Sequence, residues 1–244
     1  MTKTYLLVHG AWHSGQCWAR VVPFLGGAGH RVLTPTLTGY GETRHLAGPD
    51  VGLGTHTDDI VALILAQDLT GVVLVGHSYA GMVISAVAER VPDRIAELVF
   101  LDAMVPVDGE SACDVMPVTK TLIDLAADGE QPWRIPPLPE LPPHGLFGVT
   151  DPADVAWVRT MLGDQPVRCL TEPVRLTDLR AAALPRTHIH CIGSEPEGFA
   201  RRPAATGRVR ELTAGHDCMI TVPGELAALL LSLPGSAVTP PGGR

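Results

Sequence analysis

A serine and a distant histidine are the residues of this chain whose surroundings best suit nucleophilic catalysis. Ser78 lies in the stretch VVLVGHSYAGM, between an apolar run that predicts a strand and a run that predicts a helix. A serine at such a turn has a strained backbone, and the residues two before and two after it must be small. Gly76 is small enough, and Ala80 adds one methyl group where the pattern has a second glycine. We expect the turn to form, although a small serine that merely closes a strand is the alternative.

A serine hydroxyl is a weak nucleophile and needs a base that takes its proton. His216, in AGHDCMI, follows a late predicted strand that ends at Leu212, and a histidine after the serine is the order of hydrolases with this turn. His188 and His190 alternate on one strand face and could suggest a metal. They lack a third ligand at usable spacing, so we expect no metal.

Acyl transfer also needs hydrogen-bond donors for the oxyanion that forms during the reaction. The backbone N–H of Tyr79, directly after the serine, is one candidate. The second is the N–H of Ala11, in the loop HGAWHSG after the first predicted strand, where Gly10 allows close approach. His9 and His13 in the same loop are expected to be structural donors rather than bases.

The elements that must position these residues alternate between short β-rich runs and helical runs, which predicts an α/β fold with a mostly parallel sheet and helices on both faces. Thr55 and Asp58 suggest a capping box at the start of one helix. The predicted strands are Tyr5–Val8, Arg31–Thr34, Val72–Val75, Ile95–Leu101, Thr187–Ile192 and Arg208–Leu212. The predicted helices cover about 17–25, the run from Thr55, the run after Ser78, and 223–233.

This alternation breaks after the strand that ends near Leu101. The segment WRIPPLPELPPH is too rich in proline for a helix or an inner strand. We therefore assign 1–102 and 186–234 to the core and 103–185 to a cap inserted over the sheet, with helices near 118–127 and 152–162. The tail 235–244 is expected to be disordered.

The composition limits the classes of partner. The 244 residues are 45% apolar and carry a net charge of −8 without a basic run, so we expect neither nucleic acid nor membrane as a partner. The five cysteines are odd in number and widely spaced, and no signal peptide is apparent, which favours reduced thiols in the cytoplasm. We expect no cofactor. The sequence does not give the oligomeric state, and a homodimer is the one assembly we consider.

Four stretches together carry a resemblance to a known family: LLVHGAWHSGQCW, AGHRVLTPTLTGYGE, LVGHSYAGMV and AGHDCMI. With them the chain resembles the α/β-hydrolase superfamily, in the branch that holds plant methyl esterases, plant hydroxynitrile lyases and small bacterial esterases. The resemblance implies that Ser78 is the nucleophile, His216 the base, and Ala11 and Tyr79 the oxyanion donors.

Two departures from this branch matter. The plant lyases carry a threonine where Gly10 stands, a glutamate where His77 stands, and a lysine where this chain has Asp217. That lysine helps to hold cyanide, so cyanohydrin cleavage is disfavoured. The plant members also place the acid of the triad after the strand that matches Thr187–Ile192, where this chain reads GSEPEGF without an aspartate.

Another carboxylate must then orient His216. Asp102 ends the strand after the nucleophile strand, at the sheet edge where sites form, and some lipases of this fold place the acid there. We prefer Asp102 to Glu195 and Glu197, which remain the alternative acids. The other reading of Asp102 is a cap for the turn into the insertion.

These residues predict a carboxylesterase-type serine hydrolase that cleaves a small carboxylic ester, or a lactone or thioester, through an acyl-enzyme. The alternatives are a lyase or cyclase that uses the same site, as in hydroxynitrile lyases, and a non-catalytic receptor for a small ligand. The acyl and alcohol groups are not readable from the sequence. Candidates for an apolar pocket in the cap are Trp133, Ile135, Leu138, Leu146, Phe147, Trp157 and Met161.

Overall fold

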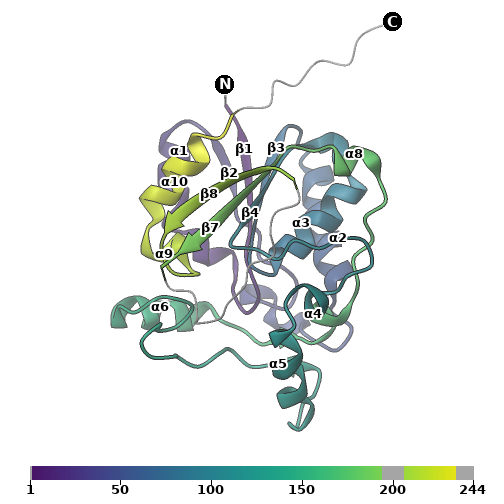
Figure 1. Ribbon diagram of the computed structural model, residues 1–244, viewed down its shortest axis with the longest axis vertical. Helices are drawn as coiled ribbons and strands as arrows, with labels where there is room; N and C mark the ends of the chain where they lie inside the picture. Colours follow the sequence, from purple (N-terminus) through teal and green to yellow (C-terminus); the bar gives the residue numbers. More distant parts are fainter. Residues whose placement is uncertain (1, 194–205, 235–244) are drawn as a thin grey trace, which may run out of the picture.

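A parallel sheet forms the centre of the protein, seen here in a computed structural model that describes residues 2–193 and 206–234 (Figure 1). Within these residues the sheet has the strand order β2-β1-β3-β4-β7-β8, and every pair of neighbours runs parallel. The predicted parallel sheet is therefore confirmed. Its strands are β1 (Thr4–Val8), β2 (Arg31–Leu33), β3 (Val72–His77), β4 (Ile95–Leu101), β7 (Arg186–Ile192) and β8 (Arg208–Thr213).

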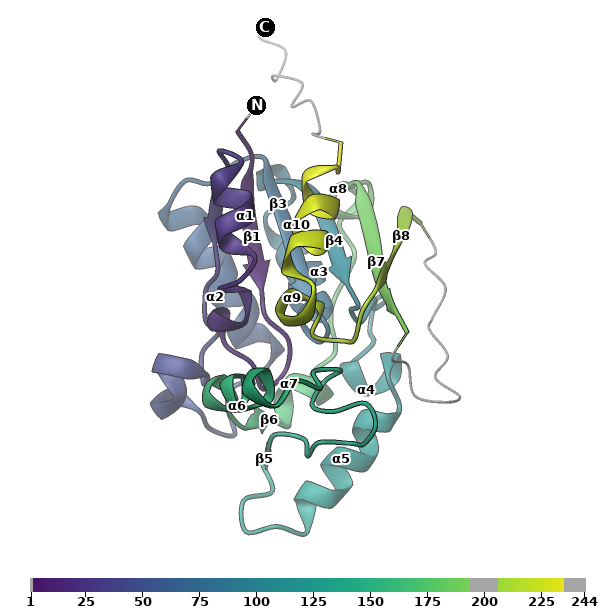
Figure 2. The ribbon, with the colours of Figure 1, turned by 90° about the vertical axis from the view of Figure 1, so that its left-hand side faces the viewer.

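Helices cover both faces of this sheet, as predicted (Figures 1 and 2). On one face lie α1 (Val22–Gly27), α9 (Cys218–Thr221) and α10 (Pro223–Leu231); on the other lie α2 (Leu53–Ala66) and α3 (Ala80–Arg90). Each layer buries its own apolar cluster against the sheet. All six residues of β3 are buried, because a central parallel strand is covered from both sides.

The chain between β4 and β7 contributes α4 (Ala112–Val115), α5 (Val118–Ala127), β5 (Arg134–Ile135), α6 (Pro152–Met161), β6 (Gln165–Pro166), α7 (Arg168–Thr171) and α8 (Leu179–Ala182). Helices α4, α5, α6 and α7 lie beyond the carboxyl ends of the strands, and α8 lies at the other end of the sheet (Figure 2). β5 and β6 form a small antiparallel pair. The helices expected near 118–127 and 152–162 correspond to α5 and α6, whereas the short α4, α7 and α8 were not predicted.

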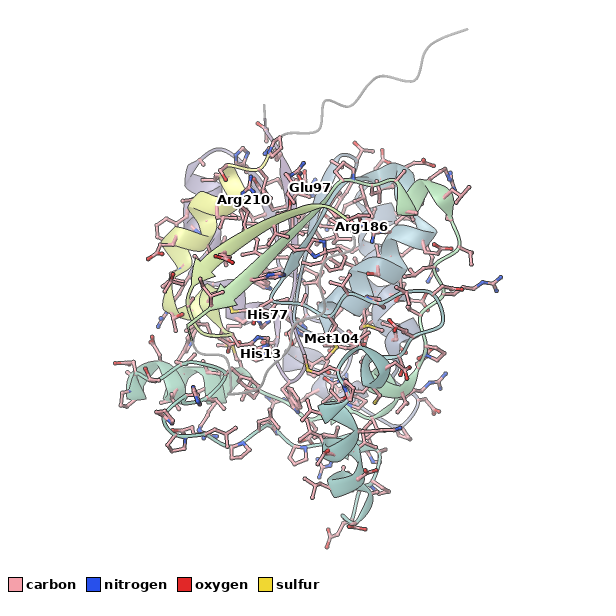
Figure 3. The ribbon with its side chains drawn as sticks, viewed as in Figure 1. His13, His77, Glu97, Met104, Arg186 and Arg210 are labelled. Carbon is pink, nitrogen blue, oxygen red and sulfur yellow. The ribbon has the colours of Figure 1, made fainter. Side chains whose placement is uncertain are left out.

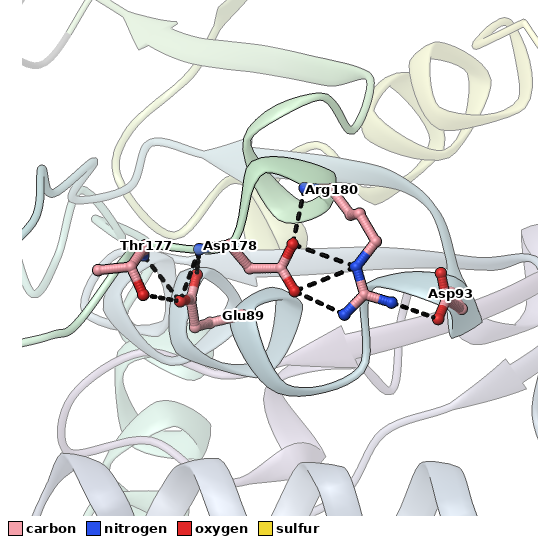
Figure 4. A network of polar contacts seen from close by, with 5 residues as sticks. All are labelled: Glu89, Asp93, Thr177, Asp178 and Arg180. Carbon is pink, nitrogen blue, oxygen red and sulfur yellow. Dashed lines mark hydrogen bonds and ion pairs between the residues drawn. The ribbon is translucent and has the colours of Figure 1, made fainter.

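The return of this segment to the core is fixed by a polar network on the surface of α3 (Figure 4). Glu89 accepts hydrogen bonds from the backbone N–H groups of Thr177 and Asp178 at 2.7 and 2.8 Å. Arg180 then bridges Asp178 and Asp93 at 2.6 and 2.9 Å. These groups are mostly exposed, so the network sets the path of the chain more than it adds stability.

One predicted helix, 17–25, and the capping box predicted for Thr55 and Asp58 are wrong. The run expected to be one helix over 17–25 is split into a short 3₁₀ turn, Gly15–Trp18, and α1, because Pro23 suits the first turn of a new helix. α2 begins at Leu53, two residues before the expected start. Thr55 is therefore inside the helix, where its hydroxyl accepts the N–H of Gly52 at 3.2 Å.

No helix in the described residues is both long and apolar enough to cross a membrane. The expected cap boundaries, 103–185, stay a prediction. The tail 235–244 lies outside the described residues.

Close packing of α3 on the chain after β4 generates a first prediction. A Cβ on Gly81 would lie 1.9 Å from the carbonyl oxygen of Met104, whose own N–H is bonded to the Ser78 carbonyl at 3.0 Å. Backbone held by this hydrogen bond cannot move away from an added methyl group. Gly81→Ala should therefore lower the free energy of unfolding by about 1–3 kcal/mol. Urea denaturation measures the change.

Gly26→Ala is the matched control. Gly26 is also helical, in α1, but a Cβ there meets nothing within 4 Å. This variant should leave the free energy of unfolding unchanged or raise it by up to about 1 kcal/mol, through helix propensity. Equal effects of the two substitutions would show that the packing of Gly81 is not tight.

Candidate active site

The turn between β3 and α3 holds Ser78 in the left-handed backbone region, with a φ of 55°. Such a φ is rare for a residue other than glycine, and it persists only where the surroundings impose it. A Cβ at residue 76 would lie 2.6 Å from the carbonyl oxygen of Ala80, which explains why Gly76 must be glycine. Ala80 itself is fully buried, so the turn accommodates its methyl group. The strained turn that the sequence predicts is present.

His216 and Asp102 lie in direct contact, although 114 residues separate them. The Nδ1 atom of His216 is 2.6 Å from Oδ2 of Asp102, and the aspartate side chain is 9% exposed. Because the carboxylate only accepts, Nδ1 carries the proton and Nε2 is left free to act as a base. This is the orientation that the preferred reading of Asp102 requires.

The end of β4 directs Asp102 toward His216. Asp102 has a φ of 45°, which aspartate tolerates better than most residues. Its N–H donates to the carbonyl of Ile189 at 2.7 Å, and its Oδ1 accepts from the N–H of Cys191 at 3.2 Å, so neighbouring β7 anchors it twice. The alternative acids, Glu195 and Glu197, lie outside the described residues.

The charge of Asp102 also sets the basicity of His216. Burial lowers the pKa of His216, but the hydrogen bond and the negative charge of Asp102 outweigh burial and hold the pKa above its ordinary value of 6.5. A base with a raised pKa accepts a proton more readily but is lost to protonation at a higher pH.

The predicted oxyanion loop packs directly on the serine turn. A Cβ on Gly10 would lie 2.9 Å from Cβ of Ser78, so only glycine allows this approach. Tyr79 is the capping residue directly before α3, where backbone N–H groups have no partner within the helix and can donate to an anion. The next N–H in the loop belongs to Ala11. These positions bring both expected donors to the serine turn.

His9 holds the peptide that carries the Ala11 N–H. Leu37 donates its N–H to Nε2 of His9 at 3.0 Å, so the ring proton is on Nδ1, which donates to the carbonyl of Gly10 at 2.9 Å. Burial lowers the pKa of His9 to about 3, and the ring is therefore neutral. His9 is thus the structural donor that the sequence predicts.

His77 joins the serine turn to the histidine loop. Its Nε2 donates to the carbonyl of His216 at 3.0 Å, and the two ring centroids are 4.5 Å apart. Burial lowers the pKa of His77 to about 3, so this ring is also neutral. Among the described residues, no hydrogen bond joins Ser78 Oγ to His216, and such bonds often form only when substrate is bound.

His13 and Asp217 form a buried pair beside these residues, with Nε2 and Oδ2 2.9 Å apart. We expected His13 to be a structural donor, but the sequence reasoning missed its partner. Asp217 attracted notice only as a departure from the lyases. The available signal was an acidic residue at the start of an apolar run, directly after the candidate base.

His188, one of the two histidines considered as metal ligands, has structural partners. The ring of His188 stacks on Phe100 with centroids 5.1 Å apart, and its Nε2 donates to the carbonyl of Thr206 at 2.9 Å. In the part of the chain that the structure describes, no group of three or more histidine, cysteine, aspartate or glutamate residues is arranged to hold a metal ion.

The expected pocket residues are only partly drawn together. The ring of Phe147 lies 5.0 Å from that of His13 and 5.8 Å from that of Trp12, next to the oxyanion loop. Trp157 instead packs under Arg20 on another surface. A cavity of about 360 Å³ opens beside the loop, between residues such as Ser14, Glu42, Arg44 and Met161; Ser78 and His216 are not among its lining residues.

Known proteins resemble this chain over nearly its whole length. The profile of the alpha/beta hydrolase family matches residues 5–229. A carbendazim hydrolyzing esterase from Nocardioides sp. (strain SG-4G) is 37% identical over 246 aligned residues, which cover 94% of this chain and 98% of that protein. Salicylic acid-binding protein 2 of Nicotiana tabacum is 28% identical, over 95% of this chain and 96% of that protein.

Among solved structures, an extracellular α/β-hydrolase from a Paenibacillus species superposes with a TM-score of 0.80 and 26% identity. The superposition covers 94% of this chain and 98% of that chain. The chain therefore belongs to the alpha/beta hydrolase family. Its similarity to a bacterial esterase and to the tobacco protein confirms the predicted branch.

The neutral buried histidines predict how stability depends on pH. Burial lowers the pKa of His9 and His77 to about 3 and that of His56 to about 4. Below the unfolded histidine pKa near 6.5, each of these three side chains binds a proton in the unfolded chain but not in the native state. Each histidine should then reduce the free energy of unfolding by about 1.4 kcal/mol per pH unit as pH falls from about 6 to 5. Urea denaturation across this range measures the slope.

A variant separates this effect from general acid sensitivity. His56 donates from Nε2 to the carbonyl of Thr38 at 3.0 Å and accepts at Nδ1 from the hydroxyl of Tyr79 at 3.1 Å. His56→Gln removes one of the three groups and should reduce the slope by about a third of their summed contribution. An unchanged slope would contradict a neutral His56.

Proposed function

We propose that the protein is a serine hydrolase that cleaves a small carboxylic ester through an acyl-enzyme formed on Ser78. The observation that carries the proposal is the strained turn at Ser78 beside a histidine whose Nδ1 is bonded to a buried carboxylate. A nucleophile, a base and a group that orients the base are the three parts that acyl transfer requires.

In the proposed mechanism, Nε2 of His216 takes the proton of Ser78 while the serine oxygen attacks the ester carbonyl. The backbone N–H groups of Ala11 and Tyr79 stabilise the oxyanion. His216 then gives its proton to the leaving alcohol, and water activated by His216 releases the acid. Asp102 keeps the imidazole in the reactive tautomer throughout.

The ester-cleaving class agrees with the comparisons, in which the relatives that cover most of this chain include a named esterase. The acyl and alcohol groups stay open, and a lactone or thioester would need the same residues. Neither a lyase nor a receptor is favoured by an observation at the site. We also propose a cytoplasmic protein, supported by its five free cysteines, and we retain the prediction of no nucleic-acid or membrane partner. The oligomeric state stays open, with a homodimer as the one assembly considered.

Covalent labelling tests the nucleophile. A fluorophosphonate should modify Ser78 alone, and Ser78→Ala should lower the turnover of p-nitrophenyl esters by several orders of magnitude, because the remaining groups cannot form an acyl-enzyme. Mass spectrometry of the labelled peptide locates the adduct.

Ser85 provides the control for this experiment. It lies in α3, seven residues or about two helical turns after Ser78. It is 7% exposed and donates its hydroxyl to the carbonyl of Gly81 at 2.7 Å. Ser85→Ala should keep both labelling and turnover. An adduct on another residue, or full turnover by Ser78→Ala, would refute the proposed nucleophile.

The pH profile tests Asp102. The unaltered protein should lose kcat/KM in acid as His216 protonates, at a pH above the ordinary histidine pKa of about 6.5. Asp102→Asn should lower kcat by up to about 10⁴-fold. It should also shift the acid limb to lower pH, because the charge that raises the pKa of His216 is gone. Steady-state rates between pH 4 and 9 measure both effects.

Glu195→Gln and Glu197→Gln are the paired controls, and both should stay close to the unaltered protein. The reverse pattern would move the acid to the later loop. Full activity in all three variants would mean that no carboxylate orients His216 through a triad.

A further inference from the structure

A buried ion pair ties the loop after β1 to the loop after β8, at the end of the sheet where Figure 3 labels His13 and His77. His13 is 1% exposed and Asp217 is fully buried. Nε2 of His13 lies 2.9 Å from Oδ2 of Asp217, and Nδ1 of His13 lies 2.7 Å from the carbonyl oxygen of Ala11. Both ring nitrogens therefore face oxygen acceptors.

Two such hydrogen bonds need two protons. A neutral imidazole has only one N–H, so the lone pair of its other nitrogen would face the lone pairs of an oxygen, which is repulsive. The carbonyl of Ala11 cannot supply the missing proton, and a carboxyl group gives up its proton far more easily than an imidazolium does. His13 is therefore a doubly protonated imidazolium, and Asp217 is its carboxylate.

The charges around the pair are compatible with this state. Burial lowers the pKa of His13, but the charge and hydrogen bond of Asp217 raise it above the ordinary value. Burial raises the pKa of Asp217, but His13 holds it below its usual range. The other titratable groups that face the pair are the neutral His9 and His77, the base His216, and the buried thiol Cys17.

The peptide between Ala11 and Trp12 is held at both ends. Its carbonyl accepts from His13, and its N–H donates to Oε1 of the fully buried Gln165 at 3.3 Å. Trp12 has a φ of 64°, a strained value for a bulky residue. Such strain persists only where the surroundings over-determine it. Without these bonds, rotation of this peptide would relieve the strain and move the neighbouring N–H of Ala11.

We propose that His13 and Asp217 are positioning residues of the oxyanion hole. Together they direct the Ala11 N–H toward the substrate carbonyl and fix its position relative to His216. Asp217 directly follows His216, so one ion pair connects the oxyanion donor with the base. The inference rests on the proposed roles of Ser78 and Ala11. Donors must be placed where charge develops, and small displacements are costly in rate.

Two substitutions at one position test the proposal. Asp217→Leu leaves His13 neutral and without its partner, so kcat for ester hydrolysis should fall about 10- to 100-fold, with KM within about twofold, since the oxyanion forms only in the transition state. Asp217→Asn can donate an amide N–H to Nε2 of a neutral His13 while Nδ1 still donates to Ala11. This variant should therefore keep most of kcat.

Glu97→Leu is the matched control. Glu97 is 1% exposed and accepts hydrogen bonds from Thr187 Oγ1 at 2.6 Å and Arg208 Nη2 at 2.5 Å. It lies at the other end of the sheet from His13 (Figure 3). Loss of this buried carboxylate should reduce stability but leave kcat unchanged. An equal loss of kcat in Glu97→Leu and Asp217→Leu would refute a positioning role.

A readout without substrate separates this inference from the proposed function. In nitrogen-15 NMR at pH 7, both ring nitrogens of His13 should carry protons, and His13→Gln should remove these signals and assign them. Should Asp217→Leu fail to fold, His13→Gln provides the same kcat and KM test. A singly protonated His13, or a kcat within twofold after loss of the pair, would overturn the inference. Full turnover by Ser78→Ala would instead refute the proposed nucleophile.

Discussion

The left-handed backbone at Ser78 is the constraint on which the rest of the site depends. It turns the chain sharply from β3 into α3, and it is tolerated only because both elements are buried and well packed. The sharp turn brings residues 76 and 80 together and requires glycine at the first position. It also sets Ser78 against Gly10, so the proposed nucleophile and the proposed oxyanion loop are in contact.

Burial and hydrogen bonding give neighbouring histidines different charge states. His9 and His77 are buried, each ring donates its N–H to a backbone carbonyl, and both rings stay neutral. His13 faces a carboxylate and a carbonyl, so it is charged in an equally buried position. His216 combines partial exposure with the carboxylate of Asp102, which suits a base that must change its charge. Residue type alone therefore does not define these roles.

Asp217 departs from the pattern of the plant lyases, and it has a structural partner in this chain. The plant lyases have a lysine at this place and a glutamate at that of His77, whereas this chain has a carboxylate and a neutral imidazole there. In this chain the buried carboxylate binds His13, and position 217 itself provides no cation for a cyanide group. This difference is consistent with ester cleavage rather than cyanohydrin cleavage.

The fold and the principal site residues could be predicted from the sequence, because they depend on local pattern. The apolar strand before Ser78, the small residues at 76 and 80, and the glycine beside Ala11 each state a backbone requirement within a few residues. The helix over 17–25 and the capping box at Thr55 were wrong, because Pro23 begins a new helix and Gly52, not Thr55, caps α2. The contact between Asp102 and His216 could be favoured from the sequence but not established. It depends on where β7, which pairs with β4, places the chain that leads to His216. The pairing of His13 with Asp217 was decided by tertiary structure alone: 204 residues separate them, and only packing of two loops excludes water and places their charges together.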